Sequence, residues 1–300
     1  MELRQLIYFV EVAKREHVSE AADTLHVAQS AISRQIANLE AELGVQLFER
    51  EGRNVKLTPI GKYFLPHAEA VLRAVENAKQ QIEEYLDPEH GTIKIGFPSS
   101  LASHTLPMVI SSFKDEHPNV KFHLRQGSYH FLIEAVKNRE LDLAFIGPVP
   151  TDEKELKGEI LFMESFAVLL PLHHHLAKRE RLALNELRNE PFVTFPKGYV
   201  LHTIVINACR QAGFSPIISS EGEDLDAIKG LVSAGIGVTL LPENTFYDTM
   251  PRYTVKIPID MPQVKRNVGV IYSTRHNLAP SVKVFYDFVK QFFSRLQQYQ

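Results

Sequence analysis

The chain has very little cysteine. One residue of this type, Cys209, occurs among 300 residues. A disulfide within the chain needs two cysteines, and a cysteine-cluster zinc site needs more than one, so the composition excludes both. We therefore expect Cys209 to pack in a core.

Long apolar runs are also missing. No run reaches eighteen apolar residues, so the sequence predicts no membrane-spanning helix. The N-terminus carries Glu2 and Arg4 in an amphipathic pattern, where a signal peptide would have a continuous apolar segment. These features predict a cytoplasmic protein with no membrane partner.

The motifs of common enzyme classes are absent as well. The sequence has no nucleophile elbow, phosphate loop or dinucleotide fingerprint, and the Gly-Ile-Gly at residues 235–237 is too short to count. His173, His174 and His175 are adjacent. Neighbours in a strand point to opposite faces, whereas helical ligands are spaced three or four residues apart. We expect no enzymatic activity, no cofactor and no metal site, with these histidines in a solvated loop.

Basic charge is not in excess. The net charge is −3, and the first 58 residues hold seven basic against nine acidic side chains. Nucleic-acid-binding domains usually have a basic balance. Binding of DNA by this region would therefore depend on the placement of a few bases and on backbone amides at helix N-termini.

Residues 18–43 predict two short helices joined by a tight turn. Apolar residues recur there with helical spacing, namely Ala21, Ala22 and Leu25, then Ile32, Ile36, Leu39 and Leu43. The opposite face of the second helix has short polar side chains and one guanidinium, which suit a DNA major groove. They are Gln29, Ser30, Ser33 and Arg34. The alternative is an ordinary amphipathic helix pair with a polar outside.

The following residues favour DNA binding. Residues 45–58 predict a two-stranded wing with Arg50 and Arg53 near its tip, where they can lie along phosphates or enter the minor groove. Thr58 and Pro59 then begin a long helix that ends before Pro88. A heptad stripe along this helix predicts pairing with a second copy, and docking on its own chain is the alternative. The stripe consists of Phe64, Ala68, Val71, Val75, Ala78, Ile82 and Tyr85.

From Gly91 onward, strands and helices alternate, which predicts α/β units with parallel strands and right-handed crossovers. One unit covers about 91–161 and 267–300, and the other covers 162–266. Residues 160–171 are interpreted as a pair of strands. The last helix is expected to bury Val284, Phe285, Phe288, Val289 and Phe292. A cleft between the two units is the expected place for a small ligand.

Residues 21–61, AADTLHVAQSAISRQIANLEAELGVQLFEREGRNVKLTPIG, resemble the DNA-binding signature of LysR-type transcriptional regulators. The resemblance extends over the whole chain. It implies a winged helix-turn-helix domain over 1–58, a linker helix over 59–88 and an α/β effector domain over 91–300 that is similar to periplasmic binding proteins. It also implies promoter DNA and RNA polymerase as partners, a dimer or tetramer, and a small-molecule effector.

The resemblance assigns roles by position. The residues that would contact DNA are Gln29, Ser30, Ser33, Arg34, Arg50, Arg53 and Thr58. Those that would contact the effector are Ser99, Ser100, Gln126, Ser128, Gly147, Thr194, Lys197 and His202. Hydroxyls, an amide and free N–H groups at helix starts suit an anionic carboxylate. A serine that merely caps its helix is the alternative at each such position.

Two stretches, residues 15–40 and 221–243, are further similar to activators of glutamate synthase operons. This similarity implies control of nitrogen assimilation, with 2-oxoglutarate or glutamate as the effector. The alternative is regulation of another metabolic operon by a different small anion. A solute-binding protein fused to a helical module is less consistent with the sequence. It would need export and would leave Arg34, Arg50 and Arg53 without a role.

Overall fold

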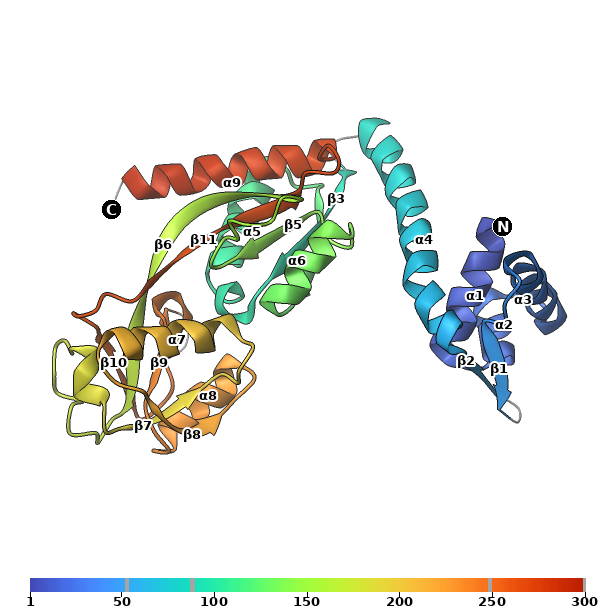
Figure 1. Cartoon of the computed structure of the whole chain (residues 1–300). Coiled ribbons are helices and arrows are strands. Elements are labelled where there is room, and N and C mark those ends of the chain that lie inside the picture. The colour runs from blue at the N-terminus through green and yellow to red at the C-terminus, as the bar shows by residue number, and fades with distance from the viewer. Residues whose placement is uncertain (52–53, 87–89, 248–249, 299–300) are drawn as a thin grey trace. The chain divides into compact units, whose positions relative to one another are not determined.

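The computed structural model describes residues 1–51, 54–86, 90–247 and 250–298. The chain divides into two compact units, Met1–Glu83 and Glu84–Gln300 (Figure 1). Among the described residues, no helix is both long enough and apolar enough to cross a membrane.

Three helices and a hairpin form the first unit. They are α1 Leu3–Arg15, α2 Val18–Leu25, α3 Gln29–Leu43, β1 Phe48–Glu51 and β2 Asn54–Leu57. The two strands are antiparallel. The turn between α2 and α3 begins at His26, whose φ is 53°, and α3 is capped at its C-terminus by Gly44, whose φ is 70°. The left-handed conformation at Gly44 is one that glycine adopts without strain.

The last turns of α3 differ from the prediction. Leu43 was expected on the buried face, but 38% of it is exposed, and Glu40 is buried instead. The Glu40 carboxylate accepts hydrogen bonds from the backbone N–H groups of Leu47 at 2.7 Å and Phe48 at 3.1 Å. Because buried backbone donors need partners, this carboxylate fixes the backbone at the start of β1.

The long helix α4, Pro59–Leu86, contributes its first turns to the core of this unit. Ala68 is 1% exposed, and Phe64 packs against Phe9 of α1 with 5.3 Å between ring centroids. The prediction that Phe64 and Ala68 face a second copy is therefore wrong, because α1 covers that side of the helix. Further along α4, Ile82 and Tyr85 are 64% and 81% exposed.

The second unit is built on a seven-stranded mixed sheet of order β10-β6-β11-β5-β3-β4, with β9 also paired to β6. The strands are β3 Thr92–Phe97, β4 Lys121–Gln126, β5 Leu143–Ile146, β6 Leu156–Pro171, β9 Thr239–Pro242, β10 Thr254–Pro258 and β11 Lys265–Ser273. A separate parallel pair consists of β7 Pro191–Thr194 and β8 Ile217–Glu221. The predicted parallel pairing holds for β3 with β4 and with β5.

Helices cover these sheets (Figure 1). They are α5 Thr105–Glu116, α6 Tyr129–Lys137, α7 Val200–Gln211, α8 Leu225–Ser233 and α9 Pro280–Gln298. In α9, Phe285 is buried against Phe113 of α5, with 4.9 Å between ring centroids. Val284 was expected to be buried, but it is 43% exposed, because the buried side of α9 passes through Val282, Phe285 and Val289.

Residues 160–171 were predicted to form a pair of strands, and this prediction is wrong. They belong to the single strand β6. Its first part, 156–165, pairs with β11, and its last part, 166–171, pairs with β9 and β10. Separate cores lie at its two ends, one drawn from residues 93–161 and 268–293 and the other from 166–264. Strands β6 and β11 thus pass from one subdomain to the other (Figure 1). The second core holds Cys209, as expected, and burial raises the pKa of its thiol to about 12.

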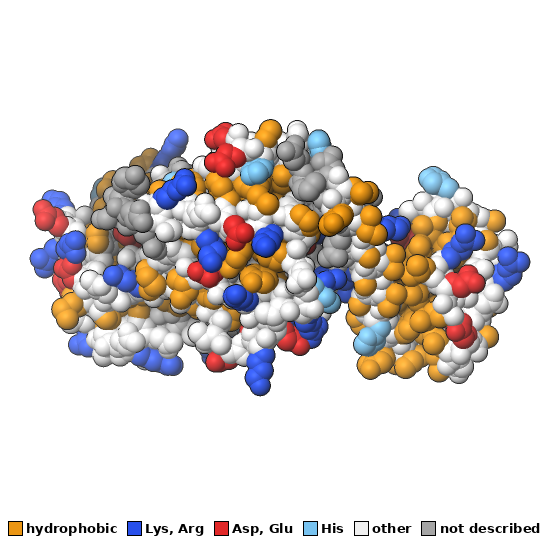
Figure 2. Space-filling model, turned by 90° about the horizontal axis from the view of Figure 1, so that it is seen from above, with side chains coloured by type: hydrophobic (Ala, Val, Ile, Leu, Met, Phe, Trp, Pro, Cys, Tyr) orange, Lys and Arg blue, Asp and Glu red, His pale blue; other side chains and the backbone are white. Residues whose placement is uncertain are grey.

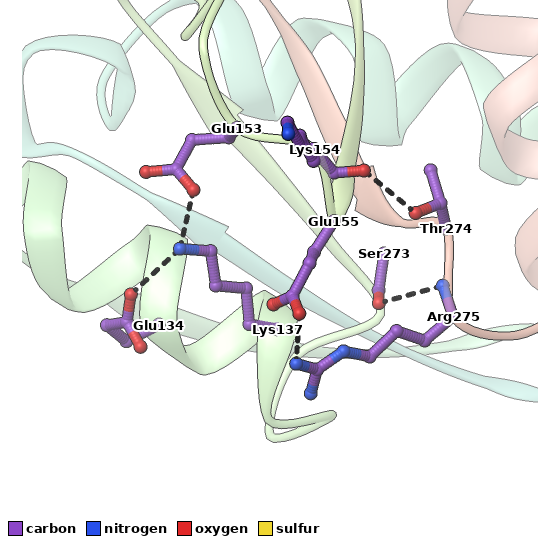
Figure 3. A network of polar contacts seen from close by, with 8 residues as sticks. All are labelled: Glu134, Lys137, Glu153, Lys154, Glu155, Ser273, Thr274 and Arg275. Carbon is purple, nitrogen blue, oxygen red and sulfur yellow. Dashed lines mark hydrogen bonds and ion pairs between the residues drawn. The ribbon is translucent and has the colours of Figure 1, made fainter.

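A polar network fastens the segment before β6 to its surroundings (Figure 3). Lys137 of α6 contacts Glu134 at 3.1 Å and Glu153 at 2.6 Å. Arg275, just after β11, pairs with Glu155. Exposed ion pairs contribute at most about 1 kcal/mol each, so the network mainly orders the segment that leads into β6.

Gly269 allows the close approach of β6 and β11, whose register shifts between Val268 and Gly269. A Cβ at Gly269 would lie 2.1 Å from the backbone oxygen of Glu159, whereas a Cβ at Gly230 in α8 would meet open space. We expect Gly269→Ala to lower the free energy of unfolding by about 1–3 kcal/mol. The control Gly230→Ala should raise it by about 0.5–1 kcal/mol. Denaturant titration measures both, and equal effects would contradict this account of the strand crossing.

Candidate functional site

One face of α3 is polar and open. Gln29, Ser30, Ser33 and Arg34 are all exposed, and so is Asn38, which the sequence reasoning did not include. Asn38 lies one helical turn after Arg34, and this spacing is the signal that could have identified it. The opposite face of the helix is held in the core by Ile32, Ile36 and Leu39.

The wing begins beside this face. Gln29 and Ser33 line the same hollow as Asn54 and Val55 at the start of β2. Arg50 is in β1, opposite Val55, and the predicted contact Arg53 lies outside the described residues. Thr58 is engaged within the domain, because its hydroxyl donates to the Gln46 carbonyl at 2.8 Å and accepts from the Gly61 N–H at 3.1 Å.

A cavity of about 510 Å³ lies in the second unit and is lined by residues of both subdomains. Six of the eight predicted effector residues line it, namely Ser99, Ser100, Gln126, Ser128, Gly147 and Lys197. The other two, Thr194 and His202, are not among the described lining residues. Thr194 is buried in β7, and a ring nitrogen of His202 lies 2.7 Å from the Phe195 carbonyl oxygen.

The cavity lies at the carboxyl ends of three parallel strands. Ser99 follows β3, Gln126 ends β4, and Gly147 follows β5. Ser128 is the N-cap of α6, and its hydroxyl accepts a hydrogen bond from the Phe131 N–H at 3.3 Å. The capping role considered from the sequence is therefore present at Ser128, at a residue that also faces the cavity.

A buried arginine at the cavity was missed by the sequence reasoning. Arg266 of β11 lines the cavity and is 4% exposed. Its Nε donates to Glu164 Oε2 at 2.6 Å, and its Nη2 donates to Ser100 Oγ at 2.9 Å. Glu164 lies opposite Arg266 in the β6–β11 ladder. Burial raises the pKa of the Glu164 carboxyl, and the Arg266 guanidinium opposes that rise.

The remaining charges of the cavity come from the other subdomain. Lys197 is exposed after β7, and Glu223 is exposed before α8. The described lining thus holds two cationic side chains, Arg266 and Lys197, and one carboxylate, Glu223. With the serine hydroxyls and the amide of Gln126, this set favours a small anion that carries further polar groups.

The three adjacent histidines lie in a loop, as predicted. Residues 172–177 form turns, so the alternation of a strand does not apply to them. The rings of His174 and His175 stack with 4.5 Å between centroids, and the Nε2 atoms lie 3.1 Å and 3.7 Å from the Glu190 carboxylate. His173 is exposed, as expected. The loop is only partly solvated, because His174 is half-buried beside Glu190.

Comparison with known families covers nearly the whole chain. The model of the bacterial regulatory helix-turn-helix protein, lysR family, matches residues 3–62, and that of the LysR substrate binding domain matches residues 86–294. The transcriptional dual regulator GltC of Bacillus subtilis (strain 168) is 66% identical over 300 residues, with all of both chains covered.

Solved structures have the same fold. The crystal structure of CbnR, a LysR family transcriptional regulator, matches with a TM-score of 0.80 at 24% identity, covering 97% of this chain and 99% of the other. A full-length OxyR variant from Pseudomonas aeruginosa matches with a TM-score of 0.69 at 25% identity, covering 97% and 98%. Together with the family models and the relative of equal length, these matches show that the chain belongs to the LysR family of DNA-binding transcriptional regulators.

Proposed function

We propose that this regulator controls a glutamate synthase operon in response to a small carboxylate bound in the cavity. The identity of 66% with GltC along the full length supports this choice of target. That relative is described as a dual regulator, so we propose both activation and repression in place of activation alone. Promoter DNA and RNA polymerase are the proposed partners, and another metabolic operon with a different anionic effector is the alternative.

We propose that α3 enters the major groove with its polar face. Gln29, Ser30, Ser33 and Arg34 are exposed there, and a guanidinium can donate two hydrogen bonds to one guanine. Arg50 and Arg53 of the wing are proposed to contact phosphates. Because the chain has a net charge of −3, affinity would come from the placement of these few bases and not from a general basic surface.

Replacement of Arg34 by Ala tests the groove contact. If Arg34 reads a base, the variant should bind operator DNA about 1–3 kcal/mol more weakly and lose preference at one position. The control is Arg179→Ala. Arg179 is exposed in the second unit, and its replacement changes the net charge by the same amount but should leave DNA binding unchanged. Fluorescence anisotropy on a set of operator variants measures both, and wild-type affinity in Arg34→Ala would remove this residue from the interface.

We propose that the effector is a dicarboxylate of the size of 2-oxoglutarate or glutamate. One carboxylate would meet Arg266 and Ser100, which already lie 2.9 Å apart, and the other would meet Lys197. Glu223 is the residue that would distinguish the two ligands. An ammonium group on the ligand would pair with this carboxylate, whereas a ketone would gain nothing from it.

Calorimetric titration with both ligands tests the effector. Loss of a charged hydrogen-bond donor costs about 1.5–3 kcal/mol, so Lys197→Ala should weaken binding of the true effector by about tenfold or more. The control is Lys178→Ala, because Lys178 is exposed and does not line the described cavity. Glu223→Gln should weaken only glutamate. No heat with either ligand on the wild-type chain would contradict the proposed effector.

We propose that the exposed stripe of α4 pairs two copies of the chain. Figure 2 shows hydrophobic side chains spread over one face of the first unit. Exposed apolar residues on α4 include Ile60, Tyr63, Val71, Ile82 and Tyr85, and α1 adds Leu3 and Ile7. A row of this kind along a 28-residue helix is typical of a helix that pairs.

Ile82→Asp tests this pairing. Ile82 is exposed within its own chain, so a charge there should leave the fold intact and dissociate the dimer, because a buried unpaired charge is costly. Val284→Asp in α9, also exposed, should not dissociate it. Analytical ultracentrifugation distinguishes the species, and a dimeric Ile82→Asp protein would refute the role of this stripe.

A further inference from the structure

Two imidazoles and a carboxylate converge in the second subdomain, away from the cavity already described. His174 and His175 follow β6, and Glu190 immediately precedes β7. The two Nε2 atoms and a carboxylate oxygen of Glu190 all lie within 4.8 Å of one another. None of the three residues lines the effector cavity as described.

The distances match the spacing of ligands around a metal ion. Zinc ligands at about 2.0–2.1 Å in a tetrahedral arrangement are separated by roughly 3.3 Å. The Nε2 atom of His174 lies 3.1 Å from Glu190 Oε2, and that of His175 lies 3.7 Å from Oε1. The two distances to Glu190 thus lie on either side of that spacing, and the more distant ring, His175, is the exposed one.

His174 is the more buried of the two histidines in the cluster. Its Nε2 atom is buried and has no hydrogen-bond partner among the described residues, although a carboxylate oxygen is 3.1 Å away. A buried ring nitrogen without a hydrogen bond is unfavourable. The other nitrogen, Nδ1, lies 3.2 Å from the Leu176 N–H. The Leu176 N–H donates to Nδ1, so a metal on Nε2, which places the ring proton on Nδ1, requires this hydrogen bond to break and the Leu176 N–H to turn away.

We propose that His174, His175 and Glu190 bind a divalent transition-metal ion such as Zn²⁺, with the remaining position open to water. Imidazole nitrogens and a carboxylate are donors that Zn²⁺ and Co²⁺ accept. Glu190 supplies the negative charge, and the exposure of His175, whose side chain is 67% accessible, gives the ion a path from solvent. The ion would tie the loop after β6 to the start of β7.

Titration of the untagged, full-length protein tests the site. We expect one Zn²⁺ per chain by calorimetry and visible absorption bands of bound Co²⁺. His175→Ala and Glu190→Gln should weaken affinity by about tenfold or more, since even loss of residues that only support a ligand costs that much. His173→Ala removes the exposed neighbour in the same triplet and should bind as the wild type does.

Thermal unfolding supplies a second measurement that does not depend on regulation. A ligand that binds only the folded state raises Tm, so Zn²⁺ should raise the Tm of the wild type and of His173→Ala equally, and that of His175→Ala by clearly less at the same concentration. Equal affinity in the wild type and His175→Ala, or an equal loss in His173→Ala, would overturn the proposal. His173 and His175 are both exposed, so a change in Zn²⁺ affinity in either variant would not be due to misfolding.

Discussion

The effector domain depends on one buried ion pair. Arg266 and Glu164 lie opposite each other on β11 and β6, the two strands that pass between the subdomains, with 2.6 Å between Nε and Oε2. Removal of either partner would leave an uncompensated buried charge, which is strongly destabilising. Ser100 and the Gly147 carbonyl also bind the guanidinium. The pair therefore holds the crossing strands, and the loops after β3 and β5, in one arrangement.

This arrangement gives the proposed effector a means of action. A ligand carboxylate that reaches Arg266 would share the guanidinium with Glu164, and its other end would meet Lys197 from the second subdomain. Such a ligand binds best when the subdomains are at one particular separation, and only this difference in affinity can shift a conformational equilibrium. In a paired regulator, a change in that separation would alter how two α3 helices are presented to DNA, and affinity depends on both binding together.

Much of this could be predicted from sequence because periodicity reports buried faces. Spacing identified the exposed face of α3 around Arg34, and the resemblance to LysR-type regulators assigned Ser99 and Ser100 to the effector site. Spacing does not tell what covers a stripe, so Ala68 was assigned to a partner although α1 covers it. It also cannot show that Glu164 meets Arg266, because that pair depends on strand register. His174 and His175 lie in turns, where neither helical nor strand spacing predicts direction.

The central claim is that occupancy of the cavity changes how the protein binds promoter DNA. DNase I footprinting on the region upstream of the chain's own gene, with and without saturating 2-oxoglutarate or glutamate, tests this most directly. We predict that one of these ligands changes the length or position of the protected region while the protein remains bound. Identical footprints with and without both ligands would contradict the claim.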